Sequence, residues 1–150
     1  MNKRNVCKEI PLAEITLRKY ERPSDLSKRD LIRKLCLSIG LLQPGDSRDI
    51  IVDVFLILFN SEKPLSSEKI QENVINYRKE NNLSLTGIAS SNIRRQIKRL
   101  KDIFLIEKNE NGYRINEGEE LINIYEQKIE KFYLNEINTR VKEYFRVLKK

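Results

Sequence analysis

Hydrophobic residues recur every three or four positions along most of the chain, which is the spacing of one face of an α-helix. The first such stretch follows the capping-box-like start Ser27-Lys-Arg-Asp30 and runs from Leu31 to Leu42, before the turn at Gln43-Pro-Gly45. A second stretch, from Ile50 to Phe59, is apolar nearly all round. That pattern fits a central core helix or a buried strand, and its length and polar flanks favour the helix.

Two further helix starts carry residues that can cap a helix. Asp46 or Ser47 can cap the 50–59 helix, and Ser66 can cap a third helix that ends near residues 81–82. Leu65 and Ile70 flank Ser66 at the spacing of a hydrophobic staple. The chain therefore predicts three helices before residue 83.

The stretch from 87 to 100 predicts a fourth helix with two contrasting faces. Ile93, Ile97 and Leu100 fall at i, i+4 and i+7 and form one apolar stripe. A turn of about 100° per residue puts basic and hydroxyl-bearing residues on the other side, namely Ser91, Arg94, Arg95 and Lys98, with Arg99 at the edge. No Asp or Glu occurs between residues 81 and 101. A DNA major groove accepts such a helix, and a solvated basic surface helix is the alternative.

Two short strands are predicted after this helix, at 103–108 and 113–115. Asn111-Gly112 lies between them and is a strong hairpin signal, since both residues tolerate positive φ. The hairpin carries Lys108 and Arg114 beside the basic helix, where they can contact a phosphate backbone. For Arg114 alone, a hairpin that only covers the core is an equally good interpretation.

A final helix begins near Asn116 and Glu119 and can continue to the C-terminus. Its apolar residues follow one another at steps of three or four, and successive groups of three steps add up to eleven, closer to a hendecad than to a heptad: Ile122, Tyr125, Ile129, Tyr133, Ile137, Val141, Tyr144 and Leu148. A helix this long cannot bury its whole stripe against so small a domain. We therefore expect a second copy to cover its distal half, with Ile137, Val141, Tyr144, Phe145 and Leu148. Folding back on the N-terminal helix is the alternative.

The chain divides into an N-terminal arm (1–23), a helical body with the hairpin (24–116) and the long C-terminal helix (117–150). Residues 1–8 are basic, and Lys3 and Arg4 can neutralise phosphates or reach a minor groove. The segment from Ile10 to Tyr20 alternates weakly, which fits either a short edge strand or an extended strap across the body.

Composition changes this picture mainly through charge and through a missing residue type. The 150 residues carry a net charge of +7, which favours a polyanionic partner. Histidine is absent, which removes the usual general base and the commonest zinc ligand, and no glycine-rich phosphate loop occurs. Asp49 and Asp53 form a carboxylate pair at i, i+4, but any acidic surface supplies such pairs. We expect no enzyme activity, no cofactor and no metal.

The two cysteines and the apolar runs bear on location. Cys7 lies in the charged arm and Cys36 in a helical pattern where a small buried thiol fits, so no disulfide framework is indicated. The longest apolar run, 50–59, is too short to span a bilayer and contains Asp53. These features predict a cytoplasmic protein without a membrane partner.

The order of these elements resembles the winged helix-turn-helix domains of prokaryotic and archaeal transcription regulators. The resemblance covers roughly residues 46–116. It rests on Leu65-Ser-Ser-Glu-Lys-Ile70, on Gly-Ile-x-x-Ser-x-Ile-x-x-x-Ile-x-x-Leu from 87 to 100, on Leu105-Ile-Glu-Lys108 and on Gly112-Tyr-Arg-Ile115. It implies a mainly α fold with a small β-hairpin wing at 105–115, a positioning helix at 66–81 and a recognition helix at 90–102.

The resemblance implies a double-stranded DNA-binding regulator acting as a homodimer. Its groove-facing residues would be Ser90, Ser91, Arg94, Arg95 and Lys98, with Arg99 at the margin and Lys108 and Arg114 on the wing. The chain departs from the family at Ala89, where Ser or Thr is common, and in a longer link between the two helices. A non-catalytic protein-interaction module within nucleic-acid machinery is the alternative. RNA is a weaker candidate, since no aromatic stacking platform is apparent.

Overall fold

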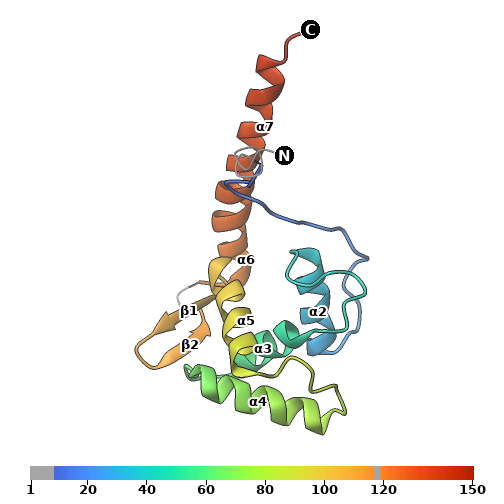
Figure 1. The fold of residues 1–150 in the computed structure, drawn as a ribbon, viewed down its shortest axis with the longest axis vertical. Coiled ribbons are helices and arrows are strands. Elements are labelled where there is room, and N and C mark those ends of the chain that lie inside the picture. Colours follow the sequence, from blue (N-terminus) through green and yellow to red (C-terminus); the bar gives the residue numbers. More distant parts are fainter. Residues whose placement is uncertain (1–8, 117–118) are drawn as a thin grey trace, which may run out of the picture.

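The computed structural model describes residues 9–116 and 119–150 (Figure 1). Its elements, in chain order, are α2 (Lys28–Ser38), α3 (Ile50–Asn60), α4 (Ser67–Glu80), α5 (Ser90–Asp102), β1 (Ile106–Asn109), β2 (Gly112–Ile115), α6 (Leu121–Ile124), the π-helix η1 (Tyr125–Leu134) and α7 (Asn135–Val147). The protein is therefore mainly helical, with a two-stranded antiparallel hairpin and a long C-terminal helix, as the sequence predicts. Lys3, Arg4 and Cys7 lie outside the described residues.

Helix α3 is the centre of the core. Val52 and Val54 are completely buried and Phe55 nearly so, and α2, α4 and α5 all pack against this helix. The prediction of a core helix here, rather than a strand, is confirmed. The predicted caps are wrong: α3 begins after Asp49, whose carboxylate binds arginines, and Asp46 instead accepts a hydrogen bond from the Arg48 N–H at 2.9 Å.

Helices α2, α4 and α5 are each followed, two residues after their last helical residue, by a residue with left-handed backbone. These residues are Gly40 (φ 78°), Asn82 (φ 56°) and Phe104 (φ 67°). In each case the next N–H bonds back to a carbonyl of the last helical turn, for example Leu41 to Cys36 at 2.9 Å, which satisfies an otherwise unpaired acceptor. Because Gly40 adopts this conformation without steric cost, α2 ends at Ser38 rather than near Leu42 as predicted.

The hairpin is anchored to the body by a third stretch of extended chain. Strands β1 and β2 pair from Ile106 opposite Ile115 to Asn109 opposite Gly112. Leu65 exchanges both backbone hydrogen bonds with Tyr113, at 2.9 and 2.8 Å, and so adds one residue to the other edge of β2. The sequence did not predict this pairing. It did predict the Ser66 cap, whose hydroxyl accepts the Lys69 N–H at 3.1 Å.

Helix α6, η1 and α7 form one continuous rod that extends away from the body (Figure 1). Ile124 and Ile129 are its buried residues, whereas Ile122, which the predicted stripe includes, is 56% exposed. Of the described residues 135–147 none is buried, so α7 does not fold back on the body. None of the described helices is long and apolar enough to cross a membrane.

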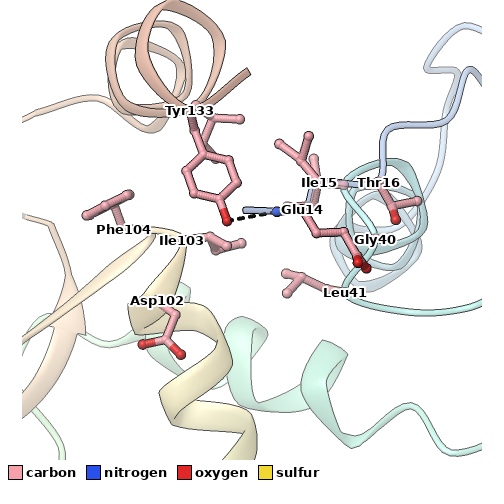
Figure 2. Close-up of a pocket in the computed structure, with 11 residues that line it drawn as sticks. Glu14, Ile15, Thr16, Gly40, Leu41, Asp102, Ile103, Phe104 and Tyr133 are labelled. Carbon is pink, nitrogen blue, oxygen red and sulfur yellow. Dashed lines mark hydrogen bonds between the residues drawn. The ribbon is translucent and has the colours of Figure 1, made fainter. Parts of the chain in front are cut away.

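An extended strap, residues 10–22, connects α2 to the rod. The Arg18 N–H donates to the Ser38 carbonyl at 2.8 Å, and the Glu14 N–H donates to the Tyr133 hydroxyl of the rod at 3.3 Å. A cavity of about 270 Å³ lies between the strap, the segment after α2, the end of α5 and the rod. Figure 2 shows the bond between Glu14 and Tyr133 at this cavity. Since the described strap pairs with no strand, the extended-strap alternative holds.

Candidate nucleic-acid interface

Helix α5 lies with its isoleucine and leucine stripe in the core. Ile93 and Leu100 are completely buried and Ile97 is 2% exposed, and the helix packs against α3 and α4. The predicted basic face lies outward: Ser90, Ser91, Arg94, Arg95 and Lys98 are all exposed. The amphipathic period alone was enough to orient this helix.

The N-terminus of α5 is held without a capping hydroxyl. Ala89 is the N-cap residue, and neither Ser90 nor any other side chain accepts a cap hydrogen bond there. Instead the Asn92 amide donates to the Gly87 carbonyl at 2.7 Å, and the Gln71 amide of α4 donates to the Ile88 carbonyl at 2.9 Å. These two bonds fix the long link between α4 and α5 to both helices.

The exposed cations of α5 differ in the hydrogen bonds and ion pairs that they form. Arg94 has no hydrogen-bond or ion-pair partner among the described residues, and Arg95 donates only to the neutral Asn92 side chain at 2.8 Å. Lys98 pairs with Asp102 at 2.8 Å, but both side chains are more than half exposed, and such surface pairs contribute little. Arg94 and Arg95 therefore keep an unneutralised charge on the outer face.

Arg99 has a different environment from the other three. Its guanidinium donates to the Leu41 carbonyl at 2.7 Å and to the Gln96 side chain at 2.8 Å, and the residue is half-buried. It thus joins α5 to the loop that follows α2.

The two predicted cations of the hairpin also differ. Lys108 is exposed, with its ammonium nitrogen 5.8 Å from the centre of the Tyr113 ring. Arg114 is half-buried and donates to Glu107 at 2.8 Å, directly across the strand pair. The charge of Arg114 is thus matched within the hairpin, while that of Lys108 is presented to solvent.

A buried ionic network between α2, α3 and α4 was not predicted from the sequence. Asp53 of α3 is completely buried and Arg78 of α4 is 2% exposed. Arg78 donates to both Asp53 and Asp49, Arg29 donates to the same two carboxylates at 2.9 Å each, and Arg33 donates to Asp49 at 3.0 Å. The Asp49–Asp53 pair therefore serves to join α2, α3 and α4.

The arginines decide the charge state of this network. Burial by itself would raise the pKa of Asp49, but the hydrogen bonds and charges of Arg29 and Arg78 outweigh it and hold that pKa below its ordinary value. Burial likewise opposes the charge on Arg29, and the two carboxylates reverse that effect and raise its pKa. No buried side-chain nitrogen or oxygen of the described residues lacks a hydrogen-bond partner.

Cys36 is the buried thiol that its helical context predicts. It is 2% exposed and free, and burial raises the pKa of the thiol to about 12, against the opposing charges of Arg99 and Arg33. It therefore stays protonated at neutral pH and is a poor nucleophile. The described part of the chain contains no cluster of three or more His, Cys, Asp or Glu residues that could hold a metal ion.

Comparison of this chain with known protein families, with curated proteins and with solved structures finds no match in any of the three.

Proposed function

We propose that this protein is a cytoplasmic, non-catalytic transcriptional regulator that binds double-stranded DNA through a winged helix-turn-helix domain. Helix α5 would enter the major groove and the β1–β2 hairpin would act as the wing. The observation that carries the proposal is the outer face of α5, where Arg94 and Arg95 are exposed and have no carboxylate partner among the described residues. Arginine is the residue best suited to bind guanine O6 and N7 bidentately.

The arrangement of elements supports this proposal. The elements follow the order of a winged helix-turn-helix domain: α3, the extended residue Leu65, α4, α5 and the hairpin. Helices α4 and α5 pack against each other and on α3, so α5 is a rigid element rather than a loop. A rigid helix can hold its base-contacting side chains in one register along a groove.

The charge distribution supports a nucleic acid as the partner. The net charge of +7 gives long-range attraction to a polyanion. Lys108 on the hairpin and Lys98 on α5 lie on elements next to each other and are both exposed, which suits contacts with the phosphates that flank the groove. Binding should therefore weaken steeply as salt is added.

Replacing Arg94 and Arg95 together by alanine is expected to weaken DNA binding by about tenfold or more, since each base-contacting arginine contributes about 1–3 kcal/mol. The measurement is fluorescence anisotropy with a duplex selected from a random DNA pool. Both side chains are exposed, so the variant should fold normally.

The matched control is Arg22→Ala with Lys79→Ala, which removes two exposed positive charges outside α5 and the hairpin. The control should change affinity only slightly. Two results would contradict base contacts by α5: selection from the pool that yields no preferred sequence, or equal losses of DNA affinity in the two double variants.

The second copy proposed for this regulator would bind the α7 stripe, meaning Ile137, Val141, Tyr144, Phe145 and Leu148. Tyr144, Phe145 and Leu148 are 74%, 72% and 80% exposed, an unusual amount for large apolar side chains that adjoin one another. The basic residues Arg146, Lys149 and Lys150 gather at the C-terminal end, while Glu130 and Glu136 lie toward the body. An antiparallel pair brings each basic end beside the acid-bearing half of its mate, whereas a parallel pair brings the basic ends together.

Changing Val141 and Leu148 to aspartate is expected to convert a dimer into a monomer, because each interface would then bury four carboxylates in an apolar contact. Light scattering after size exclusion measures the mass directly. The matched control, Asn135→Asp with Thr139→Asp, adds the same charge to the opposite face of α7 and should remain dimeric. A wild-type monomer would instead favour the alternative function, an interaction module whose exposed α7 stripe binds a different protein.

A further inference from the structure

A polar pocket of about 300 Å³ lies between α5 and the segment that joins α2 to α3. Three arginines line it, Arg48 from that segment and Arg95 and Arg99 from α5, together with a single carboxylate, Asp46. Three guanidinium groups and one carboxylate leave this basic pocket with a formal charge of +2. Like charges gathered around one cavity repel one another, so the arrangement favours an anion that compensates them.

Two of the three arginines of the basic pocket are oriented by neutral groups. Arg99 is held by the Leu41 carbonyl at 2.7 Å and Arg95 by the Asn92 side chain at 2.8 Å. The side chain of Arg48 is exposed, while its backbone N–H is fixed by Asp46 at 2.9 Å. None of the three guanidinium groups forms an ion pair with a carboxylate of the described residues. Each guanidinium has five N–H donors, so most donors in the pocket remain available to a ligand.

We infer that the basic pocket is a phosphate-binding site. Planar guanidinium groups match the oxygens of a phosphate in bidentate pairs, and several of them can surround a tetrahedral anion from different sides. A phosphate in this position comes either from a DNA backbone or from a free phosphorylated compound. The first source rests on the proposed function: Arg95 belongs both to the pocket and to the outer face of α5, so a duplex bound there brings a backbone phosphate to Arg48.

The DNA arm of the test uses Arg48→Ala, which removes an exposed side chain that holds no other element in place. For a backbone phosphate, affinity should fall about fivefold for every duplex sequence alike, and the slope of log K against log salt should shrink by about one. Asp46→Asn keeps the acceptor for the Arg48 N–H and removes the one carboxylate that lines the basic pocket. It should therefore tighten DNA binding about two- to threefold. Arg22→Ala, outside the pocket, is the matched control and should leave the slope unchanged.

The second arm titrates inorganic pyrophosphate into the free protein at constant ionic strength and follows the backbone amide signals of Gly87 and Asn92 by NMR. Saturable shifts that disappear in Arg48→Ala, with DNA affinity unaffected, assign the pocket to a free phosphorylated compound. Should the wild type bind no duplex, the proposed function fails while this arm still tests the pocket. Unchanged DNA affinity and slope in Arg48→Ala together with no saturable pyrophosphate shift would overturn the inference.

Discussion

Replacing Asp53 with alanine is expected to lower the free energy of unfolding by about 3–5 kcal/mol, the range seen when one member of a buried ion pair is removed. Asp53 is completely buried, and its loss leaves Arg78, which is 2% exposed, with only part of its counter-charge. Urea denaturation followed by circular dichroism measures the change. Arg78→Leu should cost a similar amount, since it removes one of the cations that neutralise the two carboxylates.

The exposed pair Lys98–Asp102 provides the control for this prediction. Asp102→Ala breaks an ion pair of 2.8 Å, about as long as the 2.9 Å pair between Arg29 and Asp53, but between side chains that are 73% and 57% exposed. Its effect should stay below about 1 kcal/mol, because water already screens the pair. If Asp53→Ala cost no more than Asp102→Ala, the network would not be what joins α2, α3 and α4.

Replacing Gly112 with alanine is expected to destabilise the protein by about 2–4 kcal/mol, the sum of backbone strain and a steric collision. Gly112 has a φ of 132°, which L-residues rarely adopt, and an added Cβ would lie 2.4 Å from the Leu65 carbonyl oxygen. Since that oxygen is backbone, it can move only if the Leu65–Tyr113 pairing breaks. Thermal unfolding measures the cost, and hydrogen exchange at the Tyr113 amide reports the loss of the pairing.

Gly45 separates the two contributions to this effect. It has a positive φ of 79°, but an added Cβ meets no atom within 4 Å. Gly45→Ala should therefore show the conformational cost alone, about 1–2 kcal/mol, with normal exchange at Tyr113. Equal costs for the two alanines would contradict the close approach of the hairpin to Leu65.

The parts of the fold that local periodicity governs could be predicted from the sequence. The stripe of Ile93, Ile97 and Leu100 oriented α5, and a long apolar run with polar flanks identified α3 as the core helix. Ser66 was recognisable as a cap because a helix start needs a nearby acceptor for its free N–H groups. The residues that determine each of these features lie within about one or two helical turns of one another in the sequence.

Features that depend on distant parts of the chain could not be predicted. Leu65 pairs with Tyr113 as a single residue, so no alternating pattern marks it as extended chain. Arg78 lies in a polar helix end, and its two carboxylate partners, Asp53 of α3 and Asp49 at the start of that helix, lie far away in the sequence. Arg48 likewise meets Arg95 only through the packing of a loop on α5. For each, the deciding contact is far away in sequence.

The π-helix η1 has a consequence for how two molecules could meet. In a π-helix the repeating hydrogen bond reaches five residues back rather than four, so the segment takes more residues per turn than an α-helix. The ten residues of η1 therefore change the helical phase with which α7 begins. The direction in which Val141 and Tyr144 point from the rod therefore depends on the helical geometry of η1, which ends at Leu134. The same geometry determines the side of the rod on which a second copy would bind.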